Sequence, residues 1–160
     1  MCRFLVAAVA TLFVAAATQV AASADTTKHS CSFNLTGRFA EVRLDSGQPP
    51  HSGSNTSAAT IDGTMCGKPF HGAARDVNHF PTFGKVAGVA TIFSPLGSIT
   101  VRFEATATIN RNHSATLHGS SNILSGTGIY AQASGSGTDL GLQAPNSPIT
   151  IQHLTGTLIY

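Results

Sequence analysis

The longest regular pattern in the chain is an alternation of apolar and polar residues between Gly97 and Ile109. The apolar positions are Ile99, Val101, Phe103, Ala105, Ala107 and Ile109, and the positions between them are Thr100, Arg102, Glu104, Thr106 and Thr108. Successive side chains of a β-strand point to opposite faces, so a period of two is the pattern of a strand. The segment therefore predicts a long strand with one buried face and one solvated face.

Weaker alternation of the same kind occurs in six other parts of the chain. These segments are Phe33 to Leu44, Ala58 to Met65, Gly84 to Phe93, His113 to Ile123, Gly128 to Leu140 and Ile149 to Tyr160. Clusters of Gly, Pro, Asn and Ser separate them, and Gly67 to Pro69 is expected to be one of the turns. The pattern predicts an all-β fold, a closed antiparallel barrel of about eight strands, with a two-sheet β-sandwich as the alternative.

The last of these segments changes parity along its length. Ile149 and Ile151 fit one face of a strand, whereas Leu154, Leu158 and Tyr160 fit the other. An extra residue in one strand produces such a change. We therefore expect a β-bulge near His153 and Leu154.

The N-terminus has the pattern of a cleavable secretory signal. Arg3 precedes an apolar run from Phe4 to Ala17, and small residues at Ala22 and Ala24 form a cleavage site. We therefore expect residues 1–24 to be a signal peptide and residues 25–160 to be a single β-barrel domain. The run is shorter than a membrane span, and no later segment approaches that length. The expected location is secreted, either extracellular or periplasmic, with no transmembrane segment in the mature chain.

Two cysteines, Cys31 and Cys66, follow the predicted signal peptide. An even number of cysteines in an exported chain favours a disulfide, with two free thiols as the alternative. A bridge closing a loop of this length would stabilise the fold by roughly 3–4 kcal/mol.

Charge and short motifs exclude several classes of function. Lysines and arginines are scattered singly, whereas nucleic-acid binding requires a clustered basic face. Gly126 to Ala131 matches a dinucleotide-binding fingerprint in form, but the residues after it would not sustain the helix that the fingerprint needs. The seven histidines form no pair with the spacing of metal ligands on a strand, and no Gly-x-Ser-x-Gly motif occurs. The sequence thus predicts no nucleic-acid partner, no cofactor, no metal site and no catalytic residue.

The segment from Ile123 to Gly137 contains Gly126, Gly128, Gly135 and Gly137 around an Ile-Tyr pair. It resembles a hairpin of the allene oxide cyclase and dirigent-like barrels, and more closely the uncharacterised secreted bacterial proteins of that superfamily. Positive φ is expected at Gly126 and Gly128, and close backbone approach at Gly135 and Gly137. The resemblance implies a barrel of eight antiparallel strands and makes a homo-oligomer an expectation. It transfers no active-site residue to this chain.

Charged residues on the predicted strands have two interpretations. Arg102 and Glu104 share one face, as do Glu41 and Arg43 in an earlier strand, and an outward face would make them solvated cross-strand pairs. If the barrel enclosed a polar cavity instead, Glu104 would be placed to act as a general base near Tyr130. Because the apolar face must be buried, we expect these charges to point outward.

The leading functional hypothesis is a non-enzymatic barrel that binds a small apolar ligand or an extracellular partner. Ala105 and Ala107 are small enough to leave a cavity beside Phe103, and Tyr130 is the fourth expected ligand-binding residue. The first alternative is an isomerase or cyclase-type enzyme, which would show a buried ionisable group in its pocket. The second is an outer-membrane barrel, although the aromatic girdles typical of that class are missing.

Overall fold

A computed structural model describes residues 28–46 and 53–160, and the predicted signal peptide lies outside these ranges. The strands are β1 (Ser30–Ser46), β2 (Gly53–Met65), β3 (Lys68–Phe80), β4 (Lys85–Ser94), β5 (Gly97–Ile109), β6 (Ala115–Gly126), β7 (Ser134–Gln143) and β8 (Ile149–Ile159). A short 3-10 helix, η1 (Gly128–Tyr130), precedes β7. None of the described helical residues forms a segment long enough to cross a membrane.

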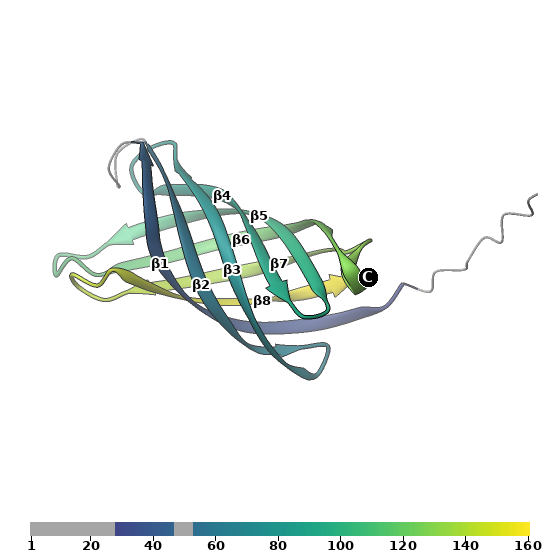
Figure 1. Ribbon diagram of the computed structural model, residues 1–160. Helices are drawn as coiled ribbons and strands as arrows, with labels where there is room; N and C mark the ends of the chain where they lie inside the picture. Colours follow the sequence, from purple (N-terminus) through teal and green to yellow (C-terminus); the bar gives the residue numbers. More distant parts are fainter. Residues whose placement is uncertain (1–27, 47–52) are drawn as a thin grey trace, which may run out of the picture.

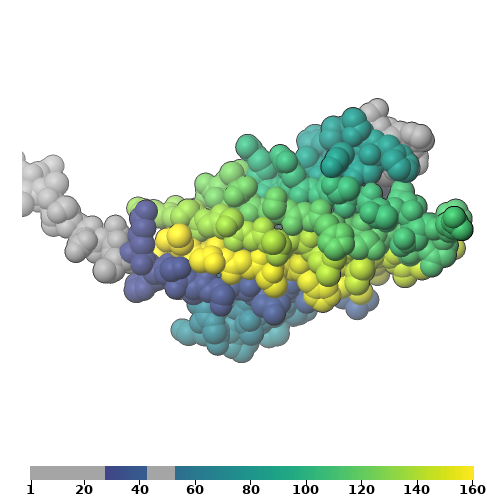
Figure 2. Space-filling model, turned by 180° about the vertical axis from the view of Figure 1, so that it is seen from behind, coloured from purple at the N-terminus to yellow at the C-terminus, as the bar shows by residue number. Residues whose placement is uncertain are grey.

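The eight strands form a closed antiparallel barrel in which each strand pairs with its neighbours in sequence (Figure 1). β1 and β8 complete the ring, with a continuous register from Ser30 opposite Ile159 to Ala40 opposite Ile149. β6, β7 and β8 lie side by side on one face, coloured green to yellow (Figure 2). Because the ring is closed, every strand has a hydrogen-bonded neighbour on both sides, and no whole strand edge is left exposed as it would be in an open sheet. The barrel prediction is confirmed, and the sandwich alternative is wrong.

β3 is a strand that the sequence pattern did not predict. The alternation predicts a turn from Gly67 to Pro69 and no strand between Pro69 and Gly84, but Lys68 to Phe80 pairs with β2 along its whole length. The reason lies in the inward positions: Phe70 and Ala74 are apolar, whereas Asp76 is polar and also buried. When polar residues also occupy inward positions, the sequence no longer alternates between apolar and polar residues, and the strand is not recognised.

The expected bulge near His153 and Leu154 is wrong. β8 pairs with both neighbours without a register shift, and Ile151 simply remains on the outer face, 36% exposed. Register shifts occur instead in β1 between Glu41 and Arg43, and in the β5–β6 pair between Thr100 and Val101. The change of parity in β8 does not reflect a bulge, because the outer face of the strand tolerates an apolar side chain.

The glycines between Gly126 and Gly137 lie where neighbouring segments of backbone approach one another closely. Gly128 begins η1 with φ +61°, as expected for a turn glycine. Gly126 does not have positive φ, contrary to expectation; a Cβ there would collide with the carbonyl oxygen of Tyr130. A Cβ on Gly137 would lie 2.6 Å from the Thr155 carbonyl oxygen and 2.9 Å from the Phe33 ring. The predicted strand from Gly128 is correspondingly shorter and starts at Ser134.

The barrel interior has two unlike halves. We call the half near residues 66–67, 95–96 and η1 the packed end, and the half near the β3–β4, β5–β6 and β7–β8 turns the cavity end. Leu35, Ile61 and Leu158 are almost fully buried at the packed end, where a void of about 20 Å³ remains. That is the space of about one water molecule. Hydrophobic packing therefore stabilises the barrel at the packed end, and the cavity end can remain hollow.

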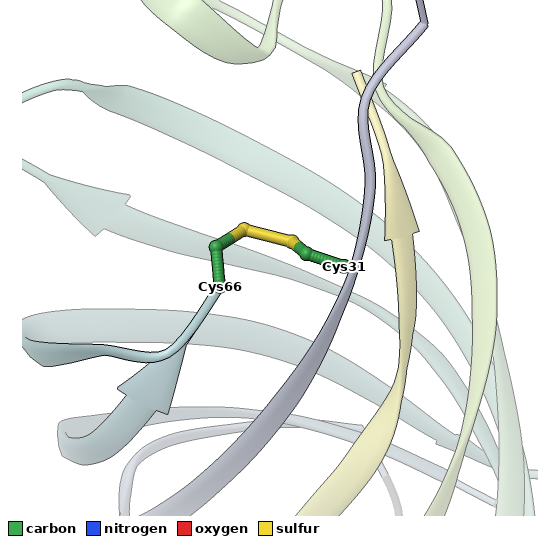
Figure 3. Close-up of a disulfide and its surroundings, with 2 residues drawn as sticks. All are labelled: Cys31 and Cys66. Atoms are coloured by element: carbon green, nitrogen blue, oxygen red, sulfur yellow. A yellow bond between two sulfur atoms is a disulfide. The ribbon is translucent and has the colours of Figure 1, made fainter.

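A disulfide between Cys31 and Cys66 ties β1 to the β2–β3 turn at the packed end (Figure 3). The two Cα atoms are 4.9 Å apart. Cys66 and Gly67 have φ +54° and +71°, the backbone of a two-residue hairpin turn with positive φ at both positions. The Cys66 amide also donates a 2.9 Å hydrogen bond to the Ser32 carbonyl oxygen. The structure supports the pairing predicted from the sequence.

Candidate functional site in the barrel cavity

The cavity end encloses a space of about 440 Å³. Its size falls within the range typical of small-molecule sites. One wall is apolar and comes mainly from β4, β5 and β6: Val86, Phe103, Ala105, Ala107, Ile109, Ala115 and Leu117. The small side chains of Ala105 and Ala107 leave room that leucine or phenylalanine would fill.

The facing wall is polar and comes from β1, β2, β3 and β7. Its principal side chains are Glu41, Asn55, Ser57, Asp76, Asn78 and Asp139. Asn55, Ser57, Asp76, Asn78 and Asp139 are all buried. Buried polar groups are unfavourable unless they are hydrogen-bonded, so a concentration of them in one half of a barrel is unusual for a purely structural core.

A chain of hydrogen bonds orders the polar side chains of β1, β2 and β3. The Asn55 amide donates to Glu41 Oε2 at 2.6 Å. The Asn78 amide donates to Asn55 Oδ1 at 2.9 Å and to Asp76 Oδ1 at 3.0 Å. The backbone amide of Ser57 also donates to Asp76 Oδ1, at 3.0 Å. Each amide side chain thus has a fixed orientation, and the Asp76 carboxyl is held in place by two donors.

Asp139 contrasts with Asp76. It lies on β7, the strand diametrically opposite β3 in the ring, and its side chain is only 6% exposed. Its Oδ1 atom has no hydrogen-bond partner, alone among the buried side-chain oxygens and nitrogens in the described part of the chain. An acceptor left unsatisfied at a buried site costs stability, so this atom is an exception that needs an explanation.

The two carboxyls influence each other. Burial, together with the negative charge of Asp76, raises the pKa of Asp139 to about 6. Burial also raises the pKa of Asp76, against the opposing effect of hydrogen bonds from Ser57 and Asn78. Two like charges that share a low-dielectric space disfavour ionisation of one another. The cavity therefore presents one oriented carboxyl and one unpartnered carboxyl that titrates near neutrality.

The structure brings three of the four predicted ligand-binding residues together. Phe103, Ala105 and Ala107 line the cavity. Tyr130 does not; it is buried at the packed end, with its ring centroid 5.8 Å from that of Tyr160. Its place in η1, one turn before β7, separates it from the hollow half.

Comparisons with known proteins add little to this geometry. No family model matches the chain, and no curated protein matches it. A solved structure described as a pyocyanin demethylase is 18% identical, over 79% of this chain and 98% of that chain, with a TM-score of 0.47. A similarity at this level carries no information on activity or ligand.

Sequence reasoning placed the charged groups incorrectly in one case and missed two others. Glu104 and Arg102 are exposed on the outer face, as expected, so Glu104 is no base for the cavity. Glu41 was expected to point outward as well, but it lines the cavity because it shares the parity of Leu35 and Phe39. Asp76 and Asp139 were not recognised as candidates at all.

The missed carboxyls left only faint signals in the sequence. Asp76 has the parity of Phe70 and Ala74, so recognition of β3 would have pointed to it. On β7 the pattern is inverted: Leu140 and Leu142 are 37% and 46% exposed, whereas Asp139, on the opposite face of the strand, is buried. Hydrophobic alternation predicts the opposite orientation for this strand.

The histidines in the described ranges do not converge on a metal site. No group of three His, Cys, Asp or Glu side chains that could hold a metal ion occurs within residues 28–46 and 53–160. His71 lies 2.7 Å from Asp62, but both side chains are well exposed on the outside of the barrel. This pair is a surface contact between β2 and β3.

Proposed function

We propose that the protein is an exported barrel that binds one small molecule in its cavity. The observation that carries the proposal is the division of the cavity into an apolar wall and an oriented polar wall. A few convergent polar groups in an otherwise apolar pocket are the usual features of a small-molecule site. The apolar ligand expected from the sequence is accordingly refined to a ligand with an apolar body and a hydrogen-bonding group.

Export is the second part of the proposal. Disulfides persist in oxidising compartments and are rare in the cytosol, so the Cys31–Cys66 bond favours a secreted or periplasmic protein. The N-terminal pattern of residues 1–24 favours the same location. Membership of the allene oxide cyclase and dirigent-like superfamily likewise stays a proposal, supported by the closed eight-stranded ring and by the glycines of residues 126–137.

Filling the cavity should abolish ligand binding. The neutral fluorophore N-phenyl-naphthylamine, which brightens in apolar surroundings, should bind the full chain saturably. Ala107→Phe places a ring in the cavity, so we expect it to weaken binding by at least about tenfold. Fluorescence titration gives the dissociation constant.

Thr108→Phe is the matched control, because Thr108 is the next residue of β5 and is exposed on the outer face. It should leave the dissociation constant within about twofold of the original value. Binding to the apolar N-terminal run would be equally insensitive to both substitutions. Equal affinities of the two variants, or no saturable binding by the unchanged chain, would contradict the proposal.

An isomerase is the second candidate function, and the unpartnered Asp139 carboxyl is the observation that favours it. A carboxylate with a pKa near 6 in an apolar site can take a proton from the carbon next to a carbonyl group and return it to another carbon. The expected result is migration of the double bond of a β,γ-unsaturated cyclic ketone, followed by NMR, with loss of the reaction in Asp139→Asn. Unchanged spectra would reject this candidate for that substrate class.

The outer-membrane hypothesis has less support from the outer surface. Exposed charged side chains occur within the outward faces of several strands, including Asp62 in β2, Arg75 in β3 and Arg102 in β5. A lipid-facing surface would instead carry a continuous apolar band, because charges at the bilayer midplane are destabilising.

A further inference from the structure

The ionisable groups that line the cavity are predominantly acidic. They are Glu41 on β1, Asp76 on β3, Asp139 on β7 and Lys85 at the start of β4. The lining residues from β2, β5, β6 and β8 contain no ionisable side chain. Lys85 does not neutralise the carboxyls, since its ammonium group donates a 2.9 Å hydrogen bond to Thr106 Oγ1 on the outer face of β5. The cavity therefore favours positive charge.

The two buried carboxyls differ in how many hydrogen bonds they already accept within the protein. The donors from Ser57 and Asn78 already satisfy Asp76 Oδ1, whereas Asp139 Oδ1 is buried without a partner. The two groups face the same space from β3 and β7, which are opposite strands of the ring, and they repel each other. A donor placed between them would satisfy the free acceptor and remove the repulsion.

The rest of the cavity restricts what that donor belongs to. The wall formed by Phe103, Ala105, Ala107 and Leu117 offers apolar contact without a hydrogen-bonding group. A ligand anion would meet three carboxyls and would be repelled. A neutral alcohol could donate one hydrogen bond to Asp139 but would leave the charges uncompensated. A protonated amine attached to an apolar body matches both walls.

We infer that the cavity selects organic cations, binding the ammonium group of a small aryl or alkyl amine between Asp139 and Asp76 and its apolar body against β5 and β6. This inference rests on the ligand-binding function proposed above. It names the chemical class of ligand, and it assigns to Asp139 the role of specificity-determining residue.

A matched series of ligands tests the inference. Naphthylmethylamine, naphthalenemethanol and naphthoic acid share one ring system and differ only in a cationic, neutral or anionic group. Each competes with N-phenyl-naphthylamine for the full chain. The amine should bind at least about tenfold more tightly than the alcohol, because hydrogen bonds between charged partners are the stronger ones, and the acid should bind most weakly.

Asp139→Asn should reduce the amine-to-alcohol affinity ratio to about one, since the amide retains the shape of the carboxyl but not its charge. Glu104→Gln removes an exposed carboxylate from the outer face of β5 and should leave the ratio unchanged. A wild-type ratio near one would overturn the cation inference while leaving the binding function intact. A high ratio that survives Asp139→Asn would overturn the assignment to Asp139.

Amine binding should also weaken in acid. Protonation of Asp139 removes the charge that holds the ammonium group, and the raised pKa of Asp76 acts in the same direction. With a pKa of about 6 for Asp139, affinity for the amine should be about tenfold lower at about pH 5 than at about pH 8. The alcohol should show no such loss, and equal pH profiles for the two ligands would contradict the inference. No saturable binding of any of these compounds would overturn the binding function together with this inference.

Discussion

Replacing Cys31 and Cys66 together by serine should lower the free energy of unfolding by about 4 kcal/mol. The bond joins residues 35 positions apart in sequence, so its loss frees a long loop in the unfolded chain. Serine keeps the Cβ atom and small size of each residue, which leaves the backbone of the residue 66–67 turn unchanged. Urea unfolding monitored by circular dichroism gives the free energy of both proteins.

A reducing agent provides the control for this prediction. It should destabilise the original protein by a similar amount and leave the double variant unaffected. A loss below about 1 kcal/mol would mean that packing around Leu35, Ile61 and Leu158 already fixes the packed end, and that the disulfide contributes little.

The packed end is the part of the fold that sequence patterns describe well. In β5, Ile99 and Val101 are buried and Arg102 is exposed, as the alternation requires. The rule holds there because the interior is filled by side chains and excludes water. Strand identity and barrel class follow from such segments, since an apolar face of this length must be covered by other strands.

The cavity end departs from that rule for a physical reason. A hollow interior accommodates polar side chains, so inward positions such as Asp76 and Asp139 carry the residues that alternation assigns to solvent. For this reason the alternation does not predict β3, and it exchanges the buried and exposed faces of β7. The two strands that the pattern misjudged, β3 and β7, both line the candidate site. A binding site needs polar side chains at inward positions, where a pattern that only builds a core has apolar ones.

The convergence of the carboxyls is a consequence of topology. Asp76 and Asp139 are far apart in sequence, and only closure of the ring between β8 and β1 places β3 opposite β7. No short motif records an arrangement of this kind. Local patterns therefore gave the apolar wall of β5, with Ala105 and Ala107, but not the acidic wall that faces it.

Asp139→Asn should stabilise the protein at neutral pH by about 3 kcal/mol, which is the free energy equivalent of raising a carboxyl pKa from 3.8 to about 6. The folded state holds this proton more tightly than the unfolded state, so the acid contributes its full stability below about pH 4. That contribution is lost as the pH rises to about 6, and it stays absent above this value. The stabilising effect of the variant should therefore be near zero at about pH 4 and reach its maximum at about pH 7.

Urea unfolding across this pH range measures the difference between the two proteins, and Glu104→Gln, at an exposed position on the outer face of β5, serves as the control without a comparable trend. A pH-independent effect of Asp139→Asn would show that the carboxyl is not strained by burial and by Asp76.

The predicted gain matters for function as well as for stability. A barrel that becomes more stable when one inward carboxyl is neutralised keeps that carboxyl at a cost, which is the usual relation between a binding site and the fold that carries it.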